Sequence, residues 1–549
     1  MVMNTASSEP GIVVDGHTSQ GAEQSSTLPG RAEGRIQSLH NDILVEIFEQ
    51  VVNTMEGVTS RLDEGVFFSD PSPLSTHIPP SSISGTASIY NLALVCRTWY
   101  AILASQPSFW TTIVARTTPR TPTADASMDF PNITARLLRS RRLAIFVYLL
   151  RQEGPADATT SIEDERSTVR ALLRSLGSDM DRVASLVVQT VHASSLPDGP
   201  GILSLCGHGS MKRIVLNAAV GSPDNGEAAI NRFRIPTAMR SLNSHLSYFS
   251  VDGMSILALL DCGAEESVDV VYMALHRLSV LAITNLSLAG ASRMESKLFT
   301  FLHALTYLVS LSFDNFKILH QTSDDTPPTA LIGLYVHVLK IRNTHRGSLA
   351  YLLQRVPTAR KVDLIRCSFE GSASVPSTIR QCEALTLDDT LPPGLARIPR
   401  TIPPSPGIIL SPPTLRLIIN GKVLLSILNL LATPHEYNLL LSVHYVTHFS
   451  IKNLRYYTPG FSEAKLEGLF ELIGFMTRLQ ELTLDSFRVR SPFTYPPFRR
   501  SLLGIHVGRL ILLNTDSASL KFILECVLDA KVLIVDGKIV ETPSAFSAV

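Results

Sequence analysis

The stretch Leu308-Val-Ser-Leu-Ser-Phe-Asp-Asn315 repeats the pattern of Leu278-Ser-Val-Leu-Ala-Ile-Thr-Asn285, which lies about 30 residues earlier. Apolar residues occupy the first, fourth and sixth positions of both stretches, and asparagine occupies the eighth. Alternating apolar positions predict a short strand that buries one face. A single such strand cannot bury that face alone, so its recurrence predicts a stack of repeats that share one core.

Further copies of this strand pattern follow one another through most of the chain. The middle apolar residues of the copies are Leu186, Ile214, Phe249, Leu281, Leu311, Leu339, Val362, Leu385, Leu417, Phe449, Leu482, Leu510 and Leu533. Their spacing is roughly 23 to 35 residues. Segments with helical spacing of apolar residues separate several copies, as in 294–302, 462–473 and 519–528. The pattern predicts an α/β solenoid with a curved parallel sheet; the alternative is a doubly wound α/β domain, which has fewer and more strongly apolar strands.

The repeats resemble the leucine-rich-repeat family, whose motif is L-x-x-L-x-L followed by asparagine. Several periods are longer than is usual in that family. In the family motif the asparagine stands three places after the last apolar strand position. In this chain five asparagines stand two places after it: Asn285, Asn315, Asn343, Asn453 and Asn514. They are interpreted first as residues that end strands in turns, with a ladder of asparagine side chains as the alternative.

Charged residues mark the position directly after the last apolar residue of several strands. They are Asp252, Asp314, Arg342, Asp388, Lys452, Asp485 and Asp536. In a solenoid the strand side chains that point away from the helices are available to a partner. We therefore expect a mainly acidic, target-binding edge that favours a partner with basic groups. The alternative is that aspartate ends these strands because it favours turns.

Two segments before the repeats have the spacing of amphipathic helices. The first has apolar residues at Ile43, Leu44, Ile47 and Phe48, with Asn41 as a candidate cap. The second is Leu92-Ala-Leu-Val-Cys-Arg-Thr-Trp99, which continues to Pro107-Ser-Phe-Trp110 and holds both tryptophans of the chain. Large rings of this kind dominate burial in small helical modules.

These two segments resemble the halves of an F-box, and their combination with irregular leucine-rich repeats is similar to the F-box proteins of fungi. The resemblance is carried by Leu39, Asp42, Ile43, Leu44, Ile47 and Phe48, then by Leu92, Val95, Cys96, Arg97 and Trp99, and finally by Pro107, Ser108, Phe109 and Trp110. His40 replaces the proline of the family pattern, and residues 57–88 lengthen the connection between the halves.

The resemblance implies a substrate-recognition adaptor of a cullin-type (SCF) ubiquitin ligase. The F-box would bind the Skp-type linker subunit and through it the cullin scaffold, and the repeats would bind the protein target. Residues implied in linker binding are Leu39, Asp42, Ile43, Leu44, Ile47, Phe48, Val95 and Trp99. The alternative is that all of these side chains belong to the hydrophobic core of the helical module. A ligase-independent repeat scaffold is the alternative function.

The remaining sequence features limit the other classes of function. Lys+Arg and Asp+Glu are equal at 48 each, which argues against nucleic acid as the main partner. The six cysteines are scattered, and no metal, cofactor or catalytic motif is found, so we expect a protein that is not an enzyme. No secretory signal or membrane span is predicted, and a cytoplasmic or nuclear location is expected.

The expected organisation has four parts. Residues 1–34 are predicted to be disordered, and residues 35–114 to form the F-box-like helical module with its inserted loop 57–88. Residues 115–132 are predicted to be a linker. Residues 133–549 are predicted to form the solenoid.

Overall fold

A computed structural model describes residues 40–50, 92–117, 131–151, 161–220, 245–261, 271–272, 274–289, 293–319, 334–356, 358–367, 377–379, 382–388, 408–410, 415–421, 424, 445–455, 463–489, 506–526 and 529–540. The chain divides into a unit of residues 1–51 and a unit of residues 52–549. Predicted disorder at 1–34, the inserted loop 57–88 and most of the predicted linker lie outside the described residues. The described part of the first unit is a helix of residues 41–50.

The larger unit is built on a sheet in which 16 strands are described, in the order β1-β2-β3-β4-β5-β6-β8-β10-β11-β13-β15-β16-β17-β18-β19-β20. All described neighbours in it are parallel except β19 and β20. The first strands are β1 Thr112–Thr117, β2 Ile145–Arg151, β3 Val183–His192, β4 Arg213–Val220, β5 Tyr248–Asp252, β6 Val280–Thr284, β8 Ser310–Asp314 and β10 Tyr335–Arg342. The others are β11 Thr358–Ile365, β13 Ala384–Asp388, β15 Arg416–Asn420, β16 His448–Lys452, β17 Glu481–Asp485, β18 His506–Leu513, β19 Asp529–Val535 and β20 Lys538–Val540.

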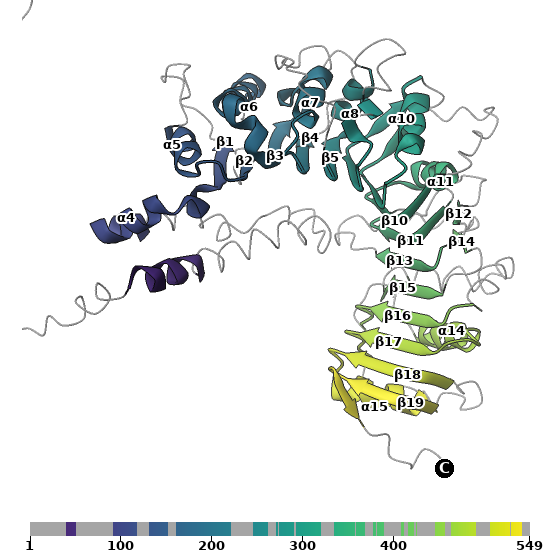
Figure 1. The fold of residues 1–549 in the computed structure, drawn as a ribbon. Helices are drawn as coiled ribbons and strands as arrows, with labels where there is room; N and C mark the ends of the chain where they lie inside the picture. Colours follow the sequence, from purple (N-terminus) through teal and green to yellow (C-terminus); the bar gives the residue numbers. More distant parts are fainter. Residues whose placement is uncertain are drawn as a thin grey trace, which may run out of the picture. The chain divides into compact units, whose positions relative to one another are not determined.

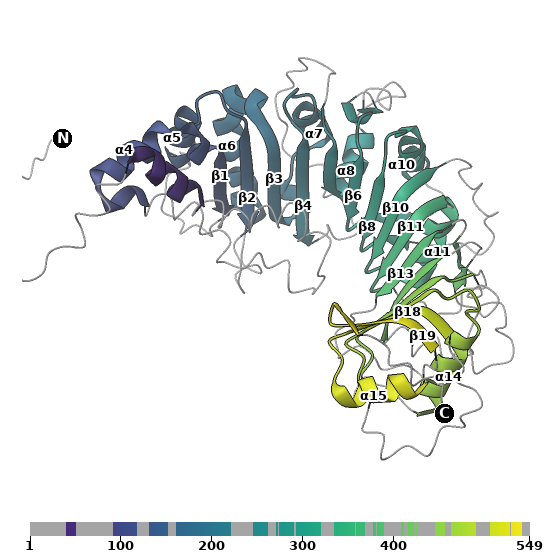
Figure 2. The same ribbon diagram turned by 60° about the horizontal axis from the view of Figure 1, so that its bottom comes forward.

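Helices cover one face of this curved sheet (Figures 1 and 2). They are α5 Pro131–Arg139, α6 Ile162–Leu176, α7 Gly199–Cys206, α8 Gly253–Leu260, α10 Arg293–Ala304, α11 Arg346–Arg355, α14 Glu463–Gly474 and α15 Ser517–Cys526. Short pieces complete the described elements: η4 Gly177–Arg182, η5 Ala193–Ser195, and the paired strands β7 Ser287–Ala289 with β9 Lys317–Leu319 and β12 Ser377–Ile379 with β14 Ile408–Leu410. The prediction of an α/β fold with a large, mostly parallel, curved sheet is confirmed.

The strand pattern predicted the alignment of the sheet to the residue. Each middle apolar residue is the register partner of the next one, from Leu186 opposite Ile214 through to Leu510 opposite Leu533. All of them belong to one continuous core, together with helix residues such as Leu259 and Leu302. Since side chains alternate along a strand, the residues between these core positions point to the opposite face, which we call the inner face.

Apart from the hairpin at Asp536, the residue that follows the last strand residue adopts a left-handed conformation in seven of the described repeats. Five of these residues are the predicted asparagines, with φ between 49° and 57°, and the other two are Arg366 and Ser486. Asparagine tolerates this conformation better than other residues with a side chain. The turn lets the backbone N–H of Asn315 donate to the carbonyl of Arg342, and that of Asn343 to Ile365, which extends the ladder beyond the strands. The interpretation as strand-ending turn residues is confirmed.

The sheet begins earlier than the sequence predicted. Thr112–Thr117 forms β1 and pairs with β2, so the predicted boundary after residue 114 falls inside a strand. Trp110 explains the continuity. Its ring is buried, its Nε1 donates to the carbonyl of Leu103 at 2.8 Å, and the guanidinium of Arg139 on α5 lies 4.4 Å from the ring centroid. Residues 97–110 and the first repeat therefore share one packed region.

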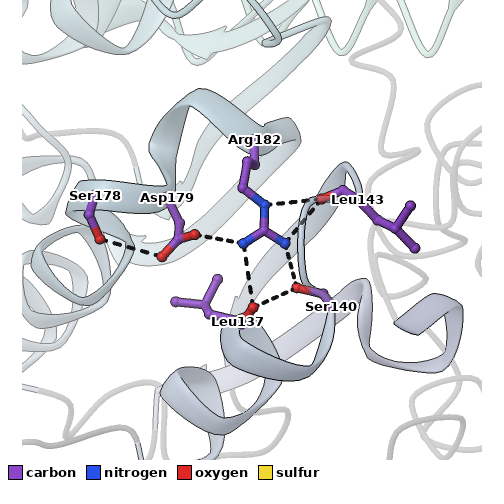
Figure 3. A network of polar contacts seen from close by, with 6 residues as sticks. All are labelled: Leu137, Ser140, Leu143, Ser178, Asp179 and Arg182. Atoms are coloured by element: carbon purple, nitrogen blue, oxygen red, sulfur yellow. Dashed lines mark hydrogen bonds and ion pairs between the residues drawn. The ribbon is translucent and has the colours of Figure 1, made fainter. Parts of the chain in front are cut away.

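Arg182 joins this first repeat to the next one (Figure 3). Its guanidinium donates to the carbonyls of Leu137 at the end of α5 and of Leu143 before β2. It also contacts the hydroxyl of Ser140 and forms an ion pair with Asp179, both at 2.6 Å. The carbonyls at the end of a helix have no partner within that helix, so a half-buried arginine here stabilises the turn into β2.

The described sheet ends in a hairpin that the sequence analysis missed. Asp536 and Gly537 both have positive φ, at 47° and 80°, as in a type I′ turn, and β20 returns antiparallel to β19. The sequence contains the pattern that predicts this hairpin, because Asp-Gly between alternating apolar residues is typical of such a turn. Asp536 therefore belongs to a hairpin turn and differs from the other charged residues predicted for the strand ends.

A close approach between repeats requires glycine at two equivalent positions. A Cβ added to Gly253 would lie 2.4 Å from the Cα of Leu286, and one added to Gly421 would lie 2.6 Å from the Cα of Leu454. Both contacted residues follow the left-handed asparagine of the next repeat. The strand-ending turn thus packs directly against the backbone of the preceding repeat.

We predict that Gly253→Ala lowers the free energy of unfolding by about 3 kcal/mol, because the contacted atoms are backbone and cannot rotate away. Gly474→Ala is the matched control. It lies at the end of α14 with nothing within 4 Å of the added Cβ, and its effect is expected within about 1 kcal/mol of zero or stabilising. Urea denaturation followed by circular dichroism measures both; equal effects of the two substitutions would contradict the account.

Candidate protein-binding surfaces

The helix of residues 41–50 buries one stripe and exposes another. Leu44 and Phe48 are buried at 3% and 1% exposure, whereas Ile43 and Ile47 are 47% and 42% exposed. The helix starts one residue earlier than an Asn41 cap would place it, because the carbonyl of His40 accepts the first two helical bonds, from Ile43 and Leu44. Asp42 is exposed in the first turn, within 3.1 Å of His40. Leu39 lies outside the described residues.

The second predicted helix is broken at Cys96. Residues 92–95 are helical, Cys96 is extended, and α4 covers Arg97–Ser105, with the Cys96 sulfur accepting from the backbone N–H of Trp99. The break changes which residues are buried. Val95 is 60% exposed and Leu94 81%, and Trp99 is only partly buried. The buried residues of this segment are instead Ile102 and Leu103 on α4, and Phe109 and Trp110 on the short helix η2 Pro107–Trp110.

Predicted linker-binding residues therefore fall into two groups. Side chains with substantial exposure are Asp42, Ile43, Ile47 and Val95, while Leu44 and Phe48 are core residues. Periodicity places residues on the same side of a helix, but it does not show where a helix is interrupted, and the extended backbone of Cys96 has no strong sequence signal.

At the ends of the strands, most aspartates of the predicted acidic edge form hydrogen bonds within the protein. Asp252 is 1% exposed and its carboxylate caps α8 by accepting from the N–H groups of Met254 and Ser255, so it is withdrawn from the target-binding set. Asp536 is exposed in the hairpin turn between β19 and β20, where its carboxylate accepts from the backbone N–H of Asn514 at 2.8 Å, and its place in the target-binding set stays a prediction.

Three other aspartates bind an asparagine amide of a later repeat. Asp314 accepts from Asn343 at 2.6 Å, Asp388 from Asn420 at 3.0 Å and Asp485 from Asn514 at 2.9 Å. A direct asparagine pair also occurs, in which Asn315 donates to Asn285 at 2.7 Å. Both sequence interpretations of the asparagines therefore hold in part: they end strands in turns, and their side chains link neighbouring repeats.

The two predicted basic residues of this edge differ in environment. Lys452 is exposed, in register between Asn420 and Asp485. Arg342 is only 9% exposed. Burial lowers the pKa of its guanidinium, which the neighbouring Asp314 and Asp363 partly offset. A cation held at such a site lies within a low-dielectric region, where its interactions with charged groups are strong.

Arg342 shares the inner face with two residues that the sequence analysis did not select. Arg213 on β4 and Tyr248 on β5 are register partners, and the Arg213 guanidinium lies 4.9 Å from the centroid of the Tyr248 ring. Burial raises the pKa of the Tyr248 hydroxyl, while the positive charges of Arg213 and Arg342 act in the opposite direction. Arg342 comes from β10, which is not a neighbour of β4 or β5, and it lies four residues beyond the position in register with Tyr248.

Other candidate chemistry in the described residues is structural. Cys206 ends α7, and its burial raises the pKa of its thiol to about 12, which leaves it without nucleophilic thiolate at neutral pH. His208 in the following turn contacts Asp181 at 2.8 Å. Among the described residues no group of His, Cys, Asp and Glu is arranged to hold a metal ion. No described helix has both the length and the apolar character required to cross a membrane.

Comparisons with known proteins show no family. No protein-family model and no curated protein matches the chain. Among solved structures, the crystal structure of a TLR13–ssRNA13 complex matches with 12% sequence identity and a TM-score of 0.29, over 64% of this chain and 41% of that chain. The match therefore spans less than half of that chain.

We predict that Asn343→Ala lowers the free energy of unfolding by about 2 kcal/mol, from left-handed backbone strain and loss of the bond to Asp314. Asn343→Gly removes the same hydrogen bond but relieves the strain. It should therefore lower the free energy of unfolding by about 1 kcal/mol less than Asn343→Ala does. Urea denaturation of both variants measures the difference. If alanine proves no worse than glycine, the left-handed turn does not contribute as described.

Proposed function

We propose that the protein is a substrate-recognition adaptor of a cullin-type ubiquitin ligase, in which residues 41–50 and 92–105 bind the Skp-type linker subunit and the repeats bind a protein target. The proposal rests on the resemblance of the two N-terminal segments to an F-box. The observation that carries it further is the exposure of large apolar residues on both segments: Ile43, Ile47, Leu94 and Val95. Exposed apolar side chains on helices are typical of protein interfaces.

The repeats suit the second half of this role. In this proposal a large partner binds the face of the long parallel sheet that the helices do not cover. An adaptor needs no catalytic groups of its own, because it raises the local concentration of a target near another enzyme. In this proposal the protein acts in the cytoplasm or nucleus, where its cysteines stay reduced; the four described ones are free thiols.

The second candidate is a repeat scaffold that binds its partner without a ligase. It is favoured by His40, which stands where the family pattern has proline and whose side chain lies beside Asp42. Co-purification separates the two functions: the adaptor brings linker and cullin subunits with it, and the scaffold does not.

We predict that Ile43→Glu combined with Val95→Glu abolishes co-purification of the Skp-type linker subunit, because each substitution places a charge in an apolar interface. Both side chains are exposed, so the fold should be unchanged. Leu138→Glu is the matched control, since Leu138 is 74% exposed on α5, and it should leave linker binding intact. Unchanged linker recovery with the double variant would refute this docking surface.

A further inference from the structure

Buried polar atoms that have no hydrogen-bond partner gather on the inner face. Within the described residues they include the hydroxyls of Ser185, Tyr248 and Thr284 and the Oδ1 atom of Asp363. These residues lie on β3, β5, β6 and β11 and alternate with core residues, which places all four on the inner face. A buried polar atom without a hydrogen bond lowers the stability of the fold. A group of such atoms on one face therefore indicates a bound partner that supplies the missing hydrogen bonds.

The order of the residues on this face is that of a binding site for an anion. Ser185, Arg213 and Tyr248 occupy the same register position on the neighbouring strands β3, β4 and β5. A hydroxyl, a guanidinium and a phenol hydroxyl therefore stand side by side, and all three can donate hydrogen bonds. Arg342 on β10 lies four residues beyond Val338, the β10 residue in register with this row, and its charge acts on Tyr248.

The strands between the two arginines carry small side chains on the inner face. Ser250, Ala282 and Ser312 are register partners on β5, β6 and β8. All three are buried, at 1%, 9% and 6% exposure, so this part of the inner face is covered in the free protein. Because neighbouring strands lie about 4.8 Å apart, the four intervals from β4 to β10 span roughly 19 Å, a distance that about six residues of extended chain can cross.

The charges in this region have a small positive excess. Arg213, Lys340, Arg342 and Lys361 are the cations, and Asp314, Asp363 and Asp388 are the carboxylates that act on Arg342. Asp314 and Asp388 each already accept an asparagine amide, and Asp363 lies 3.2 Å from Lys361. A single carboxylate suits this balance better than a doubly charged phosphate.

We propose that the inner face from β3 to β11 binds an acidic segment of the target protein, with an Asp or Glu side chain between Arg213 and Arg342 and hydrogen-bonded by Tyr248. Asp363 accepts a backbone N–H of the same segment. Arg213 rotates off the Tyr248 ring when the segment binds, which a long side chain does easily. The role of the bound protein as a ligase target rests on the proposed function, but the binding itself does not.

This inference reverses the partner expected from the sequence. Aspartates at the strand ends indicated a partner with basic groups, but these aspartates cap a helix, form a turn or bind asparagine. The cations of the inner face stand at positions that no single repeat reveals, since Arg213 and Arg342 belong to repeats separated by three others.

The test is selection of peptides from a random displayed dodecamer library on the purified full-length chain. We expect enrichment of Asp and Glu, and the best peptide should bind roughly tenfold more weakly to Arg213→Gln and to Tyr248→Phe than to the wild type. Arg509→Gln is the matched control, because Arg509 holds the same register position on β18, where it pairs with Glu481. It should leave binding unchanged.

Several results would overturn the inference. The inference is wrong if the selection enriches basic peptides or does not enrich acidic ones. It is also wrong if wild type and the Arg213 and Tyr248 variants bind the best peptide equally well. Replacement of the selected carboxylate by phosphoserine that tightens binding tenfold or more would overturn its assignment to a carboxylate. Co-purification of the linker subunit is measured on the same proteins: failure of wild type to bind it overturns the adaptor proposal alone, and loss of peptide selection with linker binding retained overturns this inference alone.

Discussion

The left-handed turn at the end of seven described strands is the constraint on which the repeats depend. It directs the chain away from the sheet, so that the N–H of the turn residue meets the last carbonyl of the next strand. Residues with a Cβ pay for this conformation, which explains why asparagine recurs there. The same turn packs against Gly253 or Gly421 of the preceding repeat, so it sets both the register and the distance between repeats.

Features carried by one repeat were predictable from the sequence, and features that need several repeats were not. The apolar triplets located the strands and their register because burial of one strand face is a local pattern, as at Leu281 and Leu311. The approach of Arg213 and Tyr248 to Arg342 depends on how the strands align across the sheet. Capping by Asp252 and pairing of Asp314 with Asn343 also went unseen, because an aspartate at a strand end looks the same whether it faces solvent or bonds within the protein.

The same limit applies to the N-terminal segments. Helical spacing located residues 41–50 and α4, but the interruption at Cys96 exposes Val95 and shifts burial to Ile102 and Leu103. Trp110 remains buried and contacts α5 through Arg139, which ties this region to the first repeat. The proposed adaptor thus has two surfaces of different chemistry: exposed apolar residues on the helices for the linker subunit, and a buried, slightly cationic region on the inner face for the target.

Hydrogen–deuterium exchange of the full-length chain with the purified Skp-type linker subunit tests the central claim, that the N-terminal helices are the docking surface. The account predicts slower exchange within residues 41–50 and 92–105 when the subunit is added, and no change in β3 to β11, where the target is proposed to bind. Unchanged exchange in both helical segments, or protection confined to the strands, would contradict it.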